Sequence, residues 1–204
     1  MVTIINYGVG NINAFINAYK RLNIETRVAK TVLDLNDVQK IILPGVGSFD
    51  YAMQKLNESG MRARLDELVL EEKIPILGIC VGMQMMANRS EEGKLDGLKW
   101  IDAEVLKFDS DKIKFATKIP HMGWNDVTAS RSNQLFSNIE KENLFYFLHS
   151  YYFKCSNDGD SIATSEYGGL FTSAVNRDNV YGIQFHPEKS HHSGEKVLNN
   201  FANL

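Results

Sequence analysis

Short apolar segments alternate with amphipathic segments through the first 90 residues. Apolar runs at residues 2–6, 25–29 and 40–43 have the length and composition of strands. Residues 74–79 form an unbroken apolar run, which is typical of a central strand covered on both faces. Apolar residues recur at helical spacing between these runs, and the predicted helices cover residues 12–22, 48–57, 61–71 and 83–88. The alternation predicts an α/β fold with a mainly parallel sheet flanked by helices.

The second half of the chain has a different pattern. Short turns separate five strand candidates, at residues 104–108, 144–153, 161–166, 170–177 and 180–185. This succession predicts an antiparallel or mixed extension of the sheet, and residues 194–204 have the spacing of a closing helix. Because no repeat, low-complexity tract or linker interrupts the chain, we expect a single domain over residues 1–204.

Composition and charge exclude several classes of protein. The 204 residues contain 22 Lys and Arg against 25 Asp and Glu, a formal net charge of −3. A nucleic-acid partner is not expected, because no basic excess is present to neutralise phosphates. The longest uncharged apolar stretch, residues 74–83, is too short for a membrane span of roughly 20 residues. With two cysteines and no basic segment before the first apolar run, we expect a cytoplasmic protein without a signal peptide.

The segment Gly-Ile-Cys-Val-Gly at 78–82 has the form of a nucleophile elbow, with Cys80 in the place of serine. Such an elbow needs small residues two positions before and after the nucleophile, because the backbone turns sharply from strand to helix. A helix N-terminus favours a thiolate, and the next backbone N–H, that of Val81, is placed to donate to an oxyanion. A buried core cysteine is the alternative interpretation, and it fits Cys155, which has no such context.

A cysteine nucleophile requires a histidine base, normally oriented by a third group. His186 ends a predicted strand, and Glu188 follows two residues later on the same side if the chain stays extended. Pro187 is expected to hold that extended geometry. A zinc deaminase also uses His-x-Glu, but it requires a Pro-Cys-x-x-Cys motif that this sequence lacks. The pair at residues 191–192 is interpreted as loop surface, because no third metal ligand accompanies it.

A dinucleotide site at residues 8–13 is a further alternative. Gly8 and Gly10 follow a strand and open a helix, as in a phosphate-binding turn. The third position of the motif is Asn13, and no acidic residue clearly ends the second strand. We therefore expect no nucleotide there.

Two of these segments together resemble a known family. Gly-Ile-Cys-Val-Gly-Met-Gln at 78–84 and Gln-Phe-His-Pro-Glu-Lys-Ser at 184–190 resemble the class I (triad) glutamine amidotransferases. Further segments are similar to the glutaminase subunits of imidazole glycerol phosphate synthases, and these are Asn-Tyr-Gly-Val-Gly-Asn at 6–11, Leu-Pro-Gly-Val-Gly at 43–47, Pro-His-Met-Gly-Trp-Asn at 120–125 and Leu-His-Ser-Tyr-Tyr at 148–152. The resemblance extends from residue 4 to about residue 201, and it implies a flavodoxin-like fold.

The resemblance implies a role for each matching residue. Cys80 would be the nucleophile, His186 the general base and acid, and Glu188 the orienting carboxylate. The oxyanion hole would be formed by Val46, Gly47 and Val81. Glutamine would be held by Gln84, His149, Ser150 and Tyr151. The partner interface and ammonia exit would include Asn11, His121, Met122, Trp124 and Asn125; by themselves, His121 and Trp124 would be interpreted as a surface turn.

The implied reaction is hydrolysis of glutamine to glutamate and ammonia, without a metal or organic cofactor. The implied partner is a synthase (cyclase) subunit of imidazole glycerol phosphate synthase, or a paralogue of it, in a heterodimer that uses the ammonia for histidine biosynthesis. A paralogous subunit that supplies ammonia for a bacterial surface sugar is the first alternative. A cysteine hydrolase or chaperone of related fold, and a non-catalytic regulatory subunit, are the alternatives from other classes.

Overall fold

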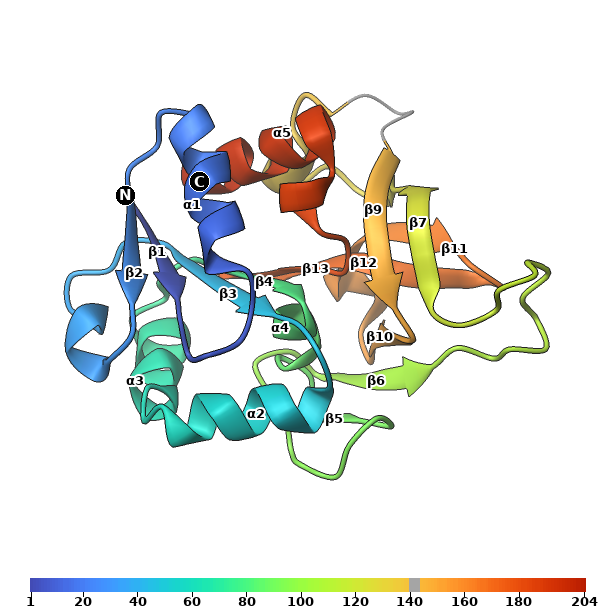
Figure 1. The fold of residues 1–204 in the computed structure, drawn as a ribbon, viewed down its shortest axis with the longest axis horizontal. Coiled ribbons are helices and arrows are strands. Elements are labelled where there is room, and N and C mark those ends of the chain that lie inside the picture. The colour runs from blue at the N-terminus through green and yellow to red at the C-terminus, as the bar shows by residue number, and fades with distance from the viewer. Residues whose placement is uncertain (140–143) are drawn as a thin grey trace.

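The first half of the chain builds the parallel part of a large mixed sheet (Figure 1). The computed structural model describes residues 1–139 and 144–204. Five strands lie side by side in parallel, in the order β2 (Thr26–Ala29), β1 (Val2–Ile5), β3 (Ile41–Gly45), β4 (Ile76–Cys80) and β13 (Val180–Ile183). The predicted α/β architecture with a mainly parallel core is confirmed.

The second half extends this sheet with antiparallel strands, as predicted. β12 (Leu170–Arg177) pairs antiparallel with β13, and β10 (Tyr151–Cys155) then pairs with β12. The remaining strands of this sheet are β6 (Ala103–Lys107), β5 (Arg89–Ser90), β11 (Ser161–Glu166) and β8 (Thr128–Ala129). A separate antiparallel pair, β7 (His121–Asp126) with β9 (Leu144–His149), lies beside the main sheet.

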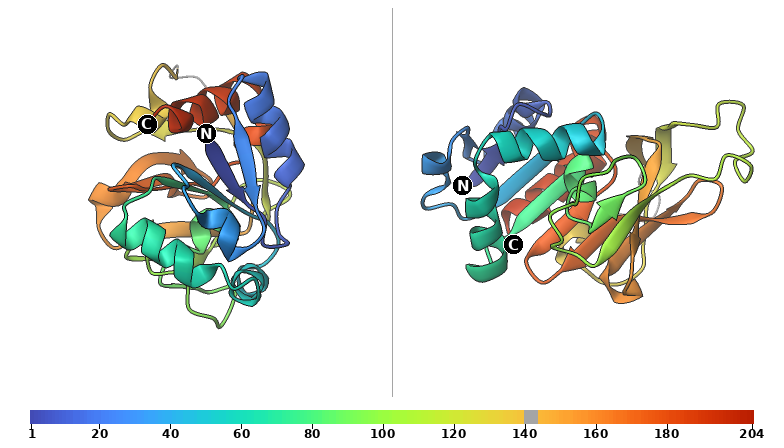
Figure 2. Two further views of the ribbon diagram at one scale, coloured as in Figure 1. Left: turned by 90° about the vertical axis from the view of Figure 1, so that its left-hand side faces the viewer. Right: turned by 90° about the horizontal axis from the view of Figure 1, so that it is seen from below.

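Helices cover both faces of the parallel strands (Figures 1 and 2). On one face lie α1 (Ile12–Arg21) and the closing helix α5 (His191–Ala202); on the other lie α2 (Phe49–Glu58) and α3 (Arg62–Asp66), which continues as a π-helical turn over Glu67–Glu71. The fifth helix, α4 (Val81–Gln84), is a single turn at the carboxyl end of β4. Short 3₁₀ turns occur at Val32–Leu35, Gln134–Phe136, Asp158–Asp160 and Pro187–Lys189.

Local sequence explains the elements that were predicted best. Every residue of β4 is buried, as its unbroken apolar pattern indicates for a central strand. Asn11 caps α1, because its side chain accepts a hydrogen bond from the backbone N–H of Ala14 at 3.2 Å.

Of the helices in the described part of the chain, none is long and apolar enough to cross a membrane.

Three predicted boundaries are wrong. The helix expected at 83–88 ends at Gln84, because the carbonyl groups of Met85 and Met86 accept hydrogen bonds from the returning segment, from Leu98 N at 2.7 Å and Trp100 N at 3.0 Å. The closing helix begins at His191 rather than at residue 194. The run at 144–153 is two strands, since the chain leaves β9 at Ser150 and enters a different sheet.

The strand β7 was not predicted. Pro120 and Gly123 give residues 120–125 the composition of a turn, and the residues of β9 that pair with β7 lie 18 to 28 positions later. Pairing of His121 with His149 buries the His121 side chain to 3% exposure. The interpretation of His121 as part of a surface turn is therefore wrong.

Candidate active site

Cys80 lies on a strained turn between β4 and α4. Its backbone has φ 54° and ψ −113°, a conformation that a residue with a side chain rarely adopts. The neighbouring glycines make room for the turn: a Cβ on Gly82 would lie 2.0 Å from the carbonyl oxygen of Leu43, and one on Gly78 would lie 2.6 Å from Met86 Cε. The strand-to-helix elbow predicted from the sequence is therefore confirmed. Cys155 is buried elsewhere, and both cysteines are free thiols.

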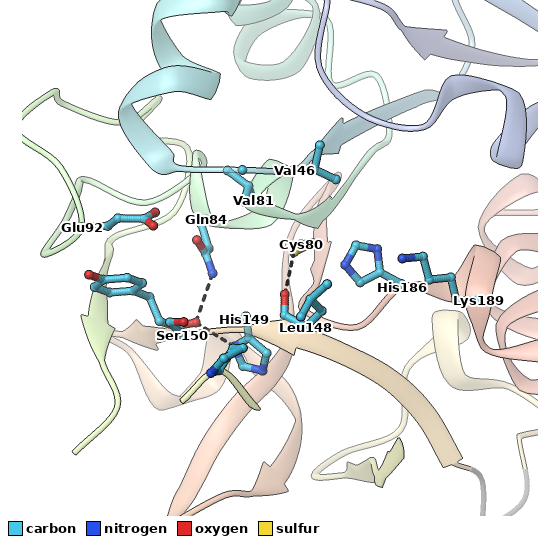
Figure 3. Close-up of a pocket in the computed structure, with 13 residues that line it drawn as sticks. Val46, Cys80, Val81, Gln84, Glu92, Leu148, His149, Ser150, His186 and Lys189 are labelled. Atoms are coloured by element: carbon cyan, nitrogen blue, oxygen red, sulfur yellow. Dashed lines mark hydrogen bonds between the residues drawn. The ribbon is translucent and has the colours of Figure 1, made fainter. Parts of the chain in front are cut away.

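A pocket of about 290 Å³ opens over Cys80 (Figure 3). Its walls come from the loop after β3, from α4, from the junction between β9 and β10, and from the segment after β13. The lining residues are Val46, Gly47, Cys80, Val81, Gln84, Glu92, Pro120, Leu148, His149, Ser150, Tyr151, His186 and Lys189. The structure thus brings together the predicted nucleophile, base, oxyanion-hole residues and substrate residues.

His186 lies beside Cys80 (Figure 3). Glu188 holds the imidazole ring of His186 in place. Its Nδ1 is 2.9 Å from Glu188 Oε1, and both side chains are at most 5% exposed. Burial lowers the pKa of His186, but hydrogen bonds and negative charge from Cys80 and Glu188 outweigh it and raise that pKa to about 10. The site therefore favours the imidazolium form of His186 beside the Cys80 sulfur.

The chain path between His186 and Glu188 differs from the predicted one. Residues Pro187–Lys189 form a 3₁₀ turn with the proline at its first position, where a missing N–H costs nothing. The turn, and not an extended strand, brings the carboxylate back to the imidazole. Ser190 fixes this turn, since its Oγ donates to the carbonyl oxygen of His186 at 2.6 Å and accepts from Tyr146 N at 2.9 Å.

The residues expected to form the oxyanion hole lie at one wall of the pocket. Val46 and Gly47 follow β3, and Val81 follows Cys80. Gly47 has φ +84°, which glycine adopts at low cost. Gly45 is pressed against the elbow, because a Cβ there would lie 2.2 Å from Gly82 N. The two backbone segments that the resemblance assigns to oxyanion binding are therefore neighbours.

Of the predicted substrate residues, some can contact a ligand and others support the wall of the pocket. The amide nitrogen of Gln84 donates to the carbonyl oxygen of Tyr151 at 3.1 Å and to Gln184 Oε1 at 2.9 Å, so its own carbonyl oxygen is what it can offer a ligand. The Nδ1 of His149 bonds the same Tyr151 oxygen at 2.7 Å, and its Nε2 bonds His121 Nδ1 at 2.9 Å. Since both ring nitrogens of His149 are engaged, its side chain supports the pocket wall.

Glu92 and Gln184 are two polar residues of the site to which the sequence analysis assigned no role, and Lys189, which also lines the pocket, is a third. Glu92 lines the pocket on the side of Gln84 and accepts a hydrogen bond from Phe49 N at 2.8 Å. Burial raises the pKa of Glu92, as does the charge of Asp50, against the lowering effect of the Phe49 bond. Gln184 is fully buried and donates to Cys80 Sγ at 3.6 Å as well as accepting from Gln84. In the sequence, Gln184 could have been found as a polar side chain within the apolar pattern of a predicted strand.

The predicted interface residues differ in their exposure and in the elements that carry them. Met122 and Trp124 are 61% and 46% exposed on β7, and the Trp124 ring stacks on His191 with centroids 5.1 Å apart. His121 is buried, whereas Asn125 donates to the carbonyl oxygen of Glu166 at 2.9 Å and lies within 3.2 Å of His121 Nε2. Asn11 is the N-cap of α1 and does not belong to β7. Across residues 1–139 and 144–204, no cluster of His, Cys, Asp and Glu could hold a metal ion.

The comparisons with known proteins agree with this geometry. The model of the family "Glutamine amidotransferase class-I" matches residues 3–203. A protein of Leptospira interrogans named imidazole glycerol phosphate synthase subunit HisH is 54% identical over the full length of both chains, and one of Bdellovibrio bacteriovorus with the same name is 52% identical, also over both full lengths.

Solved structures share the fold. A glutamine amidotransferase superposes with a TM-score of 0.76 at 18% identity, with 100% of this chain and 99% of that chain covered. A chain of PurLQS from Thermotoga maritima superposes with a TM-score of 0.70 at 18% identity, covering 99% and 97%. The chain belongs to the class I glutamine amidotransferases and, within that family, to the group of imidazole glycerol phosphate synthase HisH subunits.

Proposed function

We propose that Cys80, His186 and Glu188 hydrolyse glutamine to glutamate and ammonia, and that the ammonia passes to a synthase (cyclase) subunit of imidazole glycerol phosphate synthase in histidine biosynthesis. The observation that carries this proposal is the strained elbow that presents Cys80 to a histidine held by a buried carboxylate. The names of the full-length relatives supply the pathway.

The chemistry follows from the placement of His186 beside Cys80 and from the imidazolium form that His186 favours. The Cys80 thiolate attacks the side-chain carboxamide carbon of glutamine, and the backbone N–H groups at Val46 or Gly47 and at Val81 stabilise the oxyanion. The imidazolium of His186 donates its proton to the leaving nitrogen, so ammonia departs and a thioester remains. A water molecule then loses a proton to His186 and attacks the thioester, which releases glutamate and restores the thiolate.

Charged and polar groups in the pocket suit the rest of the substrate. Glu92 is a carboxylate at the pocket wall opposite His186, and it can accept hydrogen bonds from the α-ammonium group of glutamine. The carbonyl oxygen of Gln84 offers a second acceptor. Backbone groups of Ser150 and Tyr151 lie on the same side and can bind the α-carboxylate or ammonium.

A partner is needed because ammonia in bulk water becomes protonated and loses its nucleophilicity. Met122 and Trp124 present exposed apolar surface on β7, and the buried His121 of the same strand bonds the pocket residue His149. We assign this face to the cyclase subunit of a heterodimer, and we expect the chain to act in the cytoplasm, where Cys80 stays reduced. Hydrolysis by the isolated chain should be slow, since uncoupled turnover wastes glutamine.

The test is release of glutamate from glutamine by the purified chain, first alone and then together with the nucleotide ligand and cyclase subunit of the histidine pathway. Cys80→Ala should abolish release, whereas Cys155→Ala removes the other buried thiol and should retain it. Stimulation by the cyclase subunit supports both the chemistry and the pathway. Cys80-dependent activity that ignores this partner would favour the surface-sugar paralogue, and no glutamate under any condition would overturn the proposal.

A further inference from the structure

Tyr7 is a buried tyrosine that the proposed chemistry does not use. It follows β1, is 4% exposed, and donates a hydrogen bond from its hydroxyl to the carbonyl oxygen of Pro44 at 2.7 Å. Met85 Sδ lies 3.5 Å from the same hydroxyl, on the segment that follows the nucleophile elbow. Because a hydroxyl has one proton, the short contact to Pro44 is the one it makes as a donor.

Pro44 lies directly before the loop that we expect to form part of the oxyanion hole. It directly precedes Gly45, Val46 and Gly47, and it pairs with Ile79 in the register of β3 and β4. A proline has no N–H, so Pro44 offers its carbonyl group but no backbone donor at the end of β3. A side-chain hydrogen bond to its carbonyl group therefore contributes more to its position than it would within a regular ladder.

Close packing restricts the backbone at Pro44 and Gly45, whereas Val46 and Gly47 are packed less tightly. On one side, a Cβ on Gly10 would lie 2.8 Å from Pro44 Cβ, so the loop that carries Tyr7 packs closely on the proline ring. On the other side, Gly45 is pressed against the backbone of Gly82. In contrast, Val46 is 42% exposed, and a Cβ on Gly47 would meet only Tyr51 Cδ1, at 3.9 Å.

We propose that Tyr7 is a positioning residue for glutamine hydrolysis: its hydroxyl fixes the Pro44–Gly45 peptide as the pivot from which the backbone N–H groups of Val46 and Gly47 are aimed at the oxyanion. This inference rests on the proposed function. Burial and the charge of Cys80 both raise the pKa of Tyr7, so the hydroxyl stays protonated and remains a donor.

The test is Tyr7→Phe, which removes the hydroxyl and keeps the ring. Tyr19→Phe is a matched control, because Tyr19 is fully buried and its hydroxyl has no hydrogen-bond partner among the described residues. Each variant is assayed with the cyclase subunit for kcat and KM with glutamine. The rate of Cys80 alkylation by iodoacetamide is measured in parallel, since it reports the thiolate and its histidine without needing an oxyanion hole.

For Tyr7→Phe we expect kcat to fall by about 10- to 100-fold, less than the 10²–10³-fold loss on deleting an oxyanion donor. The KM and the alkylation rate should stay within about twofold of those of Tyr19→Phe. Equal kcat values in the two variants would overturn the inference, and so would a parallel loss of alkylation, a rise in KM that accounts for the defect, or faster hydrolysis without the partner. A parent chain that is alkylated at Cys80 but never hydrolyses glutamine would instead overturn the proposed function, and the inference with it.

Discussion

The carboxylate of Glu188 reaches the imidazole of His186 across a 3₁₀ turn, with 2.9 Å between Oε1 and Nδ1. The turn leaves Nε2 as the ring nitrogen available to Cys80, and the carboxylate fixes the proton on Nδ1. The other carboxylate oxygen, Oε2, is buried without a hydrogen-bond partner in the described part of the chain. One hydrogen bond therefore sets the orientation of the His186 ring and, together with Cys80, favours its charged form.

Glu188→Gln tests this relationship. The amide keeps the shape of the side chain but loses the charge that helps raise the pKa of His186 to about 10. That pKa should fall, so the basic limb of the profile of kcat/KM against pH should move to lower pH. We expect kcat to fall by about 10²–10⁴-fold. Glu195→Gln, which removes a surface ion-pair partner of Arg21, is the control; an unshifted basic limb in Glu188→Gln would contradict the assignment.

Gly82→Ala tests the elbow. The new Cβ would lie 2.0 Å from the carbonyl oxygen of Leu43, so either β3 or the elbow must move. We expect glutaminase activity to be lost and the free energy of unfolding to fall by about 1–3 kcal/mol or more, measured by urea denaturation. Gly159→Ala is the control, because its Cβ would meet an exposed side chain, Asn157 Oδ1, at 3.2 Å. Full activity in Gly82→Ala would show that the elbow tolerates a wider backbone path.

The parts of the site that were predictable are those encoded within a few residues of one another. An apolar strand that ends in Gly-Ile-Cys-Val-Gly specifies a turn that only small neighbours permit, and Cys80 was identified on that basis. The pairing of His186 with Glu188 was predicted correctly but from a wrong path, because spacing along the chain does not distinguish an extended strand from a 3₁₀ turn that starts at Pro187.

The parts that were not predictable depend on contacts between distant segments. The strand β7 forms because β9 pairs with it, and no pattern within residues 121–126 predicts that pairing. Glu92 enters the pocket because the loop after the nucleophile elbow folds back on the start of α2, where Phe49 N binds its carboxylate. In sequence it is one of two adjacent glutamates in a loop, and Glu91 beside it turns instead to Lys107 N.

Those two glutamates provide a matched pair for substrate binding. If Glu92 binds the α-ammonium group of glutamine, Glu92→Gln should raise the KM by about 10- to 100-fold, the factor for a hydrogen bond between charged groups worth about 1.5–3 kcal/mol. The value of kcat should change by only a few-fold, since Glu92 does not contact the reacting atoms. Glu91→Gln should leave the KM unchanged, and similar KM values in both variants would remove Glu92 from the substrate site.

The buried pair of His121 and His149 makes stability depend on pH. Burial lowers the pKa of His121 to about 4 and that of His149 to about 3, and the charge of His121 contributes to the latter. Both therefore stay neutral in the folded chain, while in the unfolded chain they become protonated as the pH falls below about 6.5. Unfolding then takes up protons, so this contribution is present above pH 6.5 and is lost as the pH falls toward 4.

The expected loss is about 1.4 kcal/mol per pH unit for each histidine. Replacing His121 with phenylalanine preserves stacking on Tyr167 and Phe147, whose centroids lie 4.1 and 4.8 Å away, but removes one of the two groups and the bond to His149 Nε2. Urea denaturation between pH 7 and 4.5 should therefore show a lower stability at pH 7, by about 1–3 kcal/mol, and a shallower decline on acidification. His192→Phe introduces the same side chain at an exposed histidine as the control. An equally steep decline in His121→Phe would show that the acid sensitivity arises elsewhere, in the carboxylates rather than in this pair.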